Sequence, residues 1–175
     1  MNKISFAVGS AYTAFLAFLV VCIDQSIKQF MPIGNEIGFT YIAFVAWAVY
    51  FLSGCTLKGG IRAAIAYIIG ISFSILIVLL AGVLSTTGFV AVPLAVLFVA
   101  FGVFYLEKAP SWFDLVPVTF VASGCYFGIM NYVPEASFCT AACVELTYGF
   151  IGLFFGWLTI TGKDILVKAF ENKKN

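Results

Sequence analysis

Long apolar runs separated by short polar stretches make up almost the whole chain. An α-helix needs about 20 mostly apolar residues to cross the hydrocarbon core of a bilayer. On that measure the sequence predicts six membrane-spanning helices. They lie near residues 5–23, 38–57, 62–84, 87–106, 112–131 and 144–161. The apolar run between the third and fourth is too long for one span, and Ser85-Thr86-Thr87-Gly88 is the only place where it can turn.

Composition identifies the solvent of these helices. The 175 residues are 63% hydrophobic and 10% charged, with a mean hydropathy of +1.10, whereas soluble domains carry about 25% charged residues. A soluble domain of this length could not hide so much apolar surface. We therefore predict one all-α transmembrane domain over residues 1–175, with the lipid bilayer as its surroundings. Helices are expected because single strands cannot satisfy their backbone in lipid.

Basic residues indicate the direction of insertion. With six spans and a cytoplasmic N-terminus, Lys28 alone among the nine Lys and Arg residues falls outside. Cytoplasmic loops carry such an excess of positive charge. We expect both termini in the cytoplasm, with residues 162–175 forming a basic tail. Six spans divide into two groups of three, which would insert in opposite senses as inverted repeats. Ser-Gly-Cys recurs at 53–55 and 123–125, on the middle helix of each group.

What the sequence lacks narrows the chemistry. A net charge of +1 without a basic patch excludes nucleic acid as a partner. Histidine is absent, and no metal-ligand spacing, phosphate loop or nucleophile elbow occurs, so we expect no metal, no cofactor and no enzymatic activity. No charged residue stands firmly in the middle of a predicted span; Glu145, the nearest, is expected about one turn from the outer surface. This argues against a proton-coupled carrier and against a carboxylate-lined cation pore.

A path for a small neutral or polar solute stays compatible with this charge-free interior. Hydroxyl, aromatic and proline residues of the second and fifth helices could line it. The candidates are Trp47, Tyr50, Ser53, Pro117, Thr119 and Ser123. Alternatively, such residues serve as interhelical hydrogen bonds and interface aromatics. The leading hypothesis is a channel or facilitator, expected to be a homo-oligomer because one protomer of this size has little interior room. The alternative is a non-transporting membrane scaffold or accessory subunit.

Small residues at regular spacing predict close helix packing. The glycines concerned are Gly70, Gly124, Gly128, Gly149, Gly152 and Gly156. They either seal helices within one protomer or line a pathway or a subunit interface. Pro93 and Pro117 lie within the fourth and fifth predicted spans, where proline removes a backbone donor and bends a helix.

Two cysteines, Cys139 and Cys143, fall in the loop predicted to lie outside, where disulfides can form. A bond between them is one option, although spacing alone does not show that the Cβ vectors converge. Cys-x-x-x-Cys without a second external pair does not fit a thiol–disulfide oxidoreductase, which favours Cys-x-x-Cys.

Two segments resemble a known family. Trp47 to Gly60 (WAVYFLSGCTLKGG) and Phe113 to Phe127 (FDLVPVTFVASGCYF) are similar, in order and separation, to segments of the YcdZ-like bacterial inner-membrane proteins. That family has six spans and no known function. The resemblance implies a multi-pass protein of the bacterial inner (cytoplasmic) membrane, and it supplies no catalytic residues.

Overall fold

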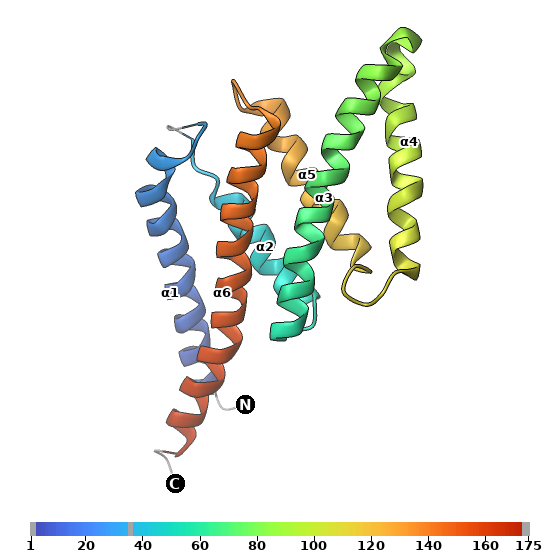
Figure 1. Ribbon diagram of the computed structural model, residues 1–175. Helices are drawn as coiled ribbons and strands as arrows, with labels where there is room; N and C mark the ends of the chain where they lie inside the picture. The colour runs from blue at the N-terminus through green and yellow to red at the C-terminus, as the bar shows by residue number, and fades with distance from the viewer. Residues whose placement is uncertain (1–2, 35–36, 173–175) are drawn as a thin grey trace. The chain divides into compact units, whose positions relative to one another are not determined.

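A computed structural model describes residues 3–34 and 37–172 of the chain (Figure 1). Every regular element among these residues is helical, which confirms the all-α prediction. The α-helices are α1 (Lys3–Ile27), α2 (Thr40–Leu52), α3 (Leu57–Val83), α4 (Ala91–Phe104), α5 (Val116–Tyr132) and α6 (Phe138–Asn172). The 3-10 helices are η1 (Lys28–Phe30), η2 (Leu84–Val90) and η3 (Tyr105–Lys108).

Three helical segments of the described residues are long and apolar enough to cross a membrane, not the six predicted. They are Ser5–Phe30, Leu57–Lys108 and Phe138–Leu166. The second contains both α3 and α4. Thr40–Leu52 is a shorter apolar helix, and at 1.5 Å per residue its 13 residues rise about 20 Å, less than the roughly 30 Å of hydrocarbon. Helices of this kind are those of a membrane protein.

Turn residues explain why α2 ends earlier than predicted. Gly54 has φ 96° and Cys55 has φ 56°, and this left-handed backbone cannot continue a right-handed helix. The next helix then begins at once, because the Thr56 hydroxyl accepts the backbone N–H of Gly59 at 3.0 Å. The first Ser-Gly-Cys is therefore a turn, whereas the second lies inside α5.

A capping box makes α6 start six residues before its predicted beginning. The Ser137 hydroxyl accepts the N–H of Thr140, and the Thr140 hydroxyl accepts the N–H of Ser137 at 2.8 Å. At its other end α6 continues to Asn172, so most of the predicted basic tail is helical. Residues 173–175 of that tail lie outside the described part of the chain.

The predicted turn between the third and fourth helices is confirmed, and the two prolines predicted within spans lie at helix starts instead. Gly88, with φ 66°, interrupts η2 where α3 gives way to α4. Pro93 and Pro117 occupy the first turns of α4 and α5. The first N–H groups of a helix have no intrahelical acceptor, so a proline there removes no intrahelical hydrogen bond.

The chain forms two compact units that differ from the two predicted halves. The first unit comprises residues 1–60 and 147–175, and the second comprises residues 61–146. The first thus holds α1, α2 and most of α6, while the second holds most of α3, all of α4 and α5, and the beginning of α6.

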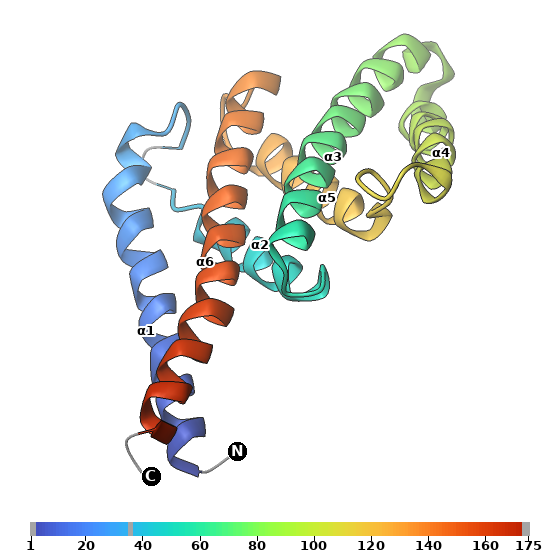
Figure 2. The same cartoon turned by 60° about the horizontal axis from the view of Figure 1, so that its bottom comes forward.

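In the first unit α1 and α6 run side by side and antiparallel (Figures 1 and 2). Tyr12 donates its hydroxyl to the carbonyl of Leu158 at 3.0 Å and covers Gly162. The beginning of α1 and the end of α6 therefore lie at the same end of this unit. Helix α2 packs on α6 through Gly152, whose missing side chain lets the Ala43 carbonyl approach; an added Cβ would stand 2.1 Å from that oxygen.

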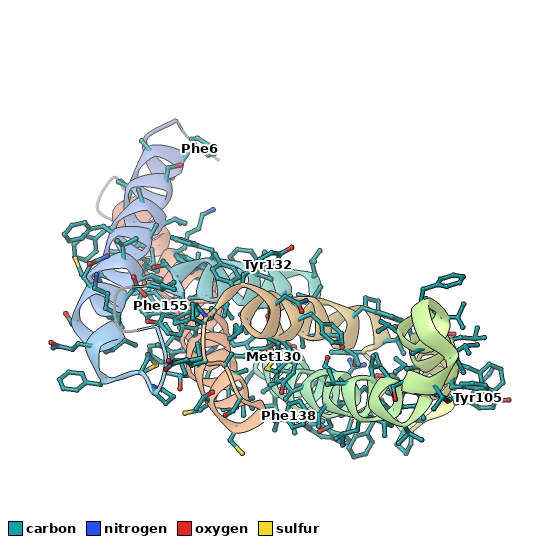
Figure 3. All side chains as sticks on the ribbon, turned by 90° about the horizontal axis from the view of Figure 1, so that it is seen from above. Phe6, Tyr105, Met130, Tyr132, Phe138 and Phe155 are labelled. Atoms are coloured by element: carbon teal, nitrogen blue, oxygen red, sulfur yellow. The ribbon has the colours of Figure 1, made fainter. Side chains whose placement is uncertain are left out.

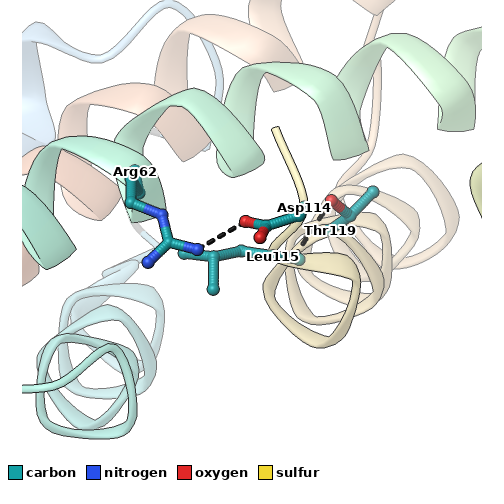
Figure 4. A network of polar contacts seen from close by, with 4 residues as sticks. All are labelled: Arg62, Asp114, Leu115 and Thr119. Atoms are coloured by element: carbon teal, nitrogen blue, oxygen red, sulfur yellow. Dashed lines mark hydrogen bonds and ion pairs between the residues drawn. The ribbon is translucent and has the colours of Figure 1, made fainter. Parts of the chain in front are cut away.

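In the second unit α3 crosses α5 at Gly70. A Cβ there would meet the Thr119 carbonyl oxygen at 2.5 Å, so the two backbones touch. An ion pair between Arg62 of α3 and Asp114 fastens the segment that leads into α5, and the Thr119 hydroxyl donates to the Leu115 carbonyl one turn back (Figure 4).

Apolar side chains cover the outer faces of the helices. Phe6 is 58% exposed, Tyr105 65% and Tyr132 83%, and Figure 3 shows apolar side chains along the outer faces. Helix α4 exposes aromatic rings along its length, with Phe101 66% exposed. Such apolar surface suits lipid rather than water.

Candidate functional site

The clearest hollow in the second unit lies between α3, α4 and α5. Its volume is about 220 Å³, and its walls are almost entirely hydrocarbon from side chains such as Phe73, Val99 and Phe120. Two of the predicted pathway residues, Thr119 and Ser123, lie in its wall. For scale, a dry apolar cavity of about 150 Å³ holds benzene.

A second hollow of about 440 Å³ adjoins the first. The two share Ile77, Val96 and Phe127, and the second reaches Met130 and Asn131 near the end of α5. Together they form an apolar groove along α5, which we call the α5 groove. Its polar groups are the hydroxyls of Thr119 and Ser123 and the amide of Asn131.

Both hydroxyls of the α5 groove already donate a hydrogen bond to backbone. Thr119 donates to the Leu115 carbonyl at 3.4 Å, and Ser123 donates across to the Gly70 carbonyl of α3 at 3.1 Å. They thus serve as interhelical and intrahelical hydrogen bonds. Thr119 is only 1% exposed, so of the two hydroxyls the half-buried one of Ser123 is the one whose oxygen can still accept a donor from a solute in the groove.

Glu145 is fully buried, contrary to the expectation that it would face headgroups or water. Its exposure is 0%, and neither carboxyl oxygen has a hydrogen-bond partner among the described residues. The early start of α6 at Phe138 explains the error, because it moves Glu145 into the third turn of the helix. The hydroxyl of Tyr67, on α3, is likewise buried without a partner.

Three titratable side chains of the second unit lie in the neighbourhood of Glu145. Tyr67 of α3, Cys125 of α5 and Tyr126 of α5 each interact electrostatically with its carboxyl group. Of these, the Tyr126 hydroxyl donates a hydrogen bond to the Phe138 carbonyl at 3.3 Å.

Because Glu145 is buried, the prediction that the interior of the helices lacks a charged residue is wrong.

A second buried carboxyl group lies in the first unit and is hydrogen-bonded. Asp24, 2% exposed, ends α1; its Oδ1 accepts the Tyr148 hydroxyl at 2.7 Å and the Phe39 N–H at 3.1 Å. Gly38 lies directly against this carboxyl, since a Cβ there would meet Oδ2 at 2.5 Å. This arrangement ties the loop before α2 to α1 and α6.

Three of the other four predicted pathway residues belong to the first unit. Trp47 packs against Phe155 of α6 with ring centroids 5.9 Å apart, and its indole N–H is buried without a described partner. Tyr50 is 2% exposed and covers Gly156. Ser53 donates its hydroxyl to the Val49 carbonyl at 2.8 Å. These residues seal α2 against α6, and Pro117 lies in the first turn of α5.

The predicted packing glycines divide into two groups. Gly70, Gly152 and Gly156 lie where an added Cβ would collide with a neighbour, as packing glycines should. Gly124 does not pack: nothing lies within 4 Å of its added Cβ, and it lines the α5 groove instead. Gly149 is buried and Gly128 is half-buried.

Cys139 and Cys143 are both exposed and are not disulfide-bonded. They lie four residues apart in the first two turns of α6, not in a loop. Side chains at that spacing on a helix have Cβ atoms about 5–6 Å apart, wider than the 3.5–4.5 Å of a disulfide.

Sequence reasoning missed both buried carboxyl groups and their tyrosines. The first predicted span ends at residue 23, directly before Asp24, and Glu145 is predicted about one turn from the outer surface. Two signals were available: Ser137, three residues before Thr140, is a capping pattern, and Tyr67 is an isolated phenol within an apolar run.

Comparison with known proteins identifies a family whose function is unknown. The chain matches the family "Protein of unknown function (DUF1097)" over residues 4–162. Searches of curated proteins and of solved structures gave no match. Nothing in this match refers to the YcdZ-like proteins, so that resemblance stays a prediction. Because the match spans nearly the whole sequence, the chain belongs to the DUF1097 family of proteins of unknown function.

Proposed function

We propose that this protein is a membrane facilitator for small, uncharged and weakly polar solutes, and that the solute occupies the α5 groove. The observation that carries the proposal is the groove itself, which the predicted residues Thr119 and Ser123 line. Hydrocarbon walls with one accessible acceptor oxygen, that of Ser123, suit a molecule with a small apolar body and one hydroxyl. They offer too few polar partners for a sugar or an ion.

The proposal includes six spans with both ends in the cytoplasm of a bacterial inner membrane, and a homo-oligomer. The excess of Lys and Arg on one side supports the orientation, as does the shared end of α1 and α6. Helix α2 alone is too short to cross the hydrocarbon core of the bilayer. Buried residues beyond its ends, such as Phe39 at 0% exposure, support a crossing completed by backbone that protein covers.

Flux through proteoliposomes tests the proposal. Vesicles containing the purified protein are given an osmotic step with short-chain alcohols and amides, and their volume is followed by light scattering. We expect faster swelling than in empty vesicles for at least one small alcohol. No flux above empty vesicles for any solute would contradict the proposal.

A blocking variant tests the place of the path. Gly124→Phe puts a ring into open space in the groove, where no atom lies within 4 Å of the added Cβ, so we expect loss of flux with the fold kept. Gly102→Phe is the matched control, since it too is an exposed helical glycine with open space, but it lies outside both hollows. Equal flux in the two variants would remove the α5 groove from the path.

The exposed rings of α4 favour a second function, a scaffold that binds another membrane protein. Phe98 is 59% exposed and Phe101 66%. Purification in mild detergent separates the two functions, because a foreign protein in fixed stoichiometry supports the scaffold and a homo-oligomer alone opposes it.

A further inference from the structure

The second unit contains an acid that its own structure does not stabilise in the charged form. Glu145 is 0% exposed, and its two oxygens have no hydrogen-bond partner among the described residues. An ionised carboxylate buried without hydrogen bonds or a counter-charge is very costly, and such a group neutralises instead. No basic side chain among the described residues bonds to its oxygens, and Arg62, the base of the ion pair described for this unit, is paired with Asp114. A proton is the remaining way to neutralise it.

Tyr67 supplies the second half of the arrangement. Its hydroxyl, on α3, is buried without a partner among the described residues and lies near enough to Glu145 of α6 for the charge of one group to affect the other. A phenol can accept a hydrogen bond from a protonated carboxyl group and donate one to a carboxylate. Tyr67 can therefore assist both forms of Glu145 by turning one O–H bond. Cys125 and Tyr126, the other titratable neighbours, come from α5.

We propose that Glu145 is a proton-binding site of this protein, with Tyr67 as its hydroxyl partner. While the site is dry the carboxyl group would hold the proton; when water reaches the site, the O–H bond would break, with the proton passing to water and the electron pair staying on the carboxylate. Ionisable groups inside membrane helices are costly, and proton relays in pumps and transporters use such groups. The site would make the charge of the second unit depend on its access to water. This inference does not rest on the proposed solute path.

Infrared spectroscopy of the purified full-length protein in lipid tests proton exchange directly. Protonated and ionised carboxyl groups absorb at different frequencies, so a pH titration shows when a buried acid loses its proton. We expect one high-frequency carboxyl band that disappears reversibly as the pH rises. The band should be absent from Glu145→Gln. In Glu145→Asp it should remain but at a shifted frequency. In Tyr67→Phe the pH at the midpoint of its titration should change. Glu107→Gln, which replaces an exposed acid of η3, is the control, and it should leave the pH titration of the high-frequency carboxyl band unchanged.

Chemical labelling gives an independent readout. Dicyclohexylcarbodiimide is apolar and reacts with protonated carboxyl groups, whose O–H adds across its N=C bond. We expect one adduct per chain on the peptide containing Glu145, with a yield that falls as the pH rises, and none in Glu145→Gln.

Three results would overturn the proposal. They are a carboxyl band that does not change with pH, a titration that survives in Glu145→Gln, and a carbodiimide adduct absent from the Glu145 peptide at every pH. The first would make Glu145 a permanently neutral packing residue. Neither measurement uses a solute, so failure of the facilitator leaves this test unaffected, and failure of this test leaves the flux experiments unaffected.

Discussion

The two compact units each bury one carboxyl group, and they treat it in opposite ways. In the first unit Asp24 accepts hydrogen bonds from the Tyr148 hydroxyl and the Phe39 N–H, through a single oxygen. In the second unit Glu145 is buried more completely, yet neither of its oxygens has a described partner. Tyrosines lie near both acids, but among the described residues only Tyr148 donates a hydrogen bond to the acid beside it.

This difference separates a structural acid from a candidate functional one. A carboxyl group that joins α1, α6 and the loop before α2 is explained by the contacts it makes. A carboxyl group that joins nothing is not explained by stability, because an apolar side chain of the same size would pack there without a polar cost. The comparison therefore predicts that removing Asp24 damages the fold and that removing Glu145 does not.

The largest effect is expected for Asp24→Leu. The substitution leaves the Phe39 N–H and the Tyr148 hydroxyl buried without an acceptor, at about 1–3 kcal/mol each. We expect the free energy of unfolding in detergent to fall by about 2–6 kcal/mol. Asp24→Asn is the matched control, because its Oδ1 can still accept both donors, and it should lose less. Equal losses in the two variants would mean that charge, and not the hydrogen bonds, is what Asp24 provides.

Close approach of α2 to α6 gives the next largest effect. In Gly152→Ala the new Cβ would meet the Ala43 carbonyl oxygen at 2.1 Å, and backbone cannot move aside cheaply. Overpacking of this kind costs about 1–3 kcal/mol, measured as a lower midpoint of thermal unfolding. Gly124→Ala in the second unit meets nothing and should be neutral or stabilising. A stable Gly152→Ala variant would show that α2 is not held against α6.

The same two glycines show what the sequence can and cannot predict. Small-residue spacing identified Gly152 and Gly124 equally, since spacing along one helix says nothing of what faces it. The helical content followed from hydropathy, because lipid leaves a spanning backbone little choice. The helix ends did not, because they depend on single residues such as Ser137, whose hydroxyl starts α6 early, and Gly54, which ends α2.

The sequence predicted the location of the two hydroxyl groups of the candidate site, but it did not predict the burial of Glu145. Thr119 and Ser123 sit on one face of an apolar helix, so their common location in the α5 groove follows from helical periodicity. Burial of Glu145 depends on side chains from another helix, such as Tyr67, that lie far away in the sequence. A shift of a few residues in the start of α6 was enough to move the acid from a predicted surface to the interior.

A smaller effect than that of Asp24→Leu is expected when one donor of Asp24 is removed. Tyr148→Phe keeps the ring that packs on Phe39 at 5.8 Å between centroids, and deletes the 2.7 Å hydrogen bond. The loss should be about 1–3 kcal/mol of unfolding free energy. In an Asp24→Leu background the same substitution should cost almost nothing, because the acceptor is already gone. If the losses of unfolding free energy were additive in the double variant, Tyr148 and Asp24 would act independently, and their hydrogen bond would not explain the effect of Asp24→Leu.

The smallest effect is expected for Glu145→Met, and it is the sharpest test of the comparison. Methionine has a similar length and no polar atom that needs a partner, and no described residue, Tyr67 included, makes a hydrogen bond to Glu145 in the structure that the substitution would break. The unfolding free energy should therefore change by less than about 1 kcal/mol or should rise, since burying a polar group without a partner is unfavourable. Glu145→Met should at the same time lose the pH-dependent carboxyl band, whereas Asp24→Leu keeps that band in whatever fraction stays folded. A loss of stability in Glu145→Met as large as that of Asp24→Leu would mean that Glu145 holds a structural partner, and the two acids would then play the same part.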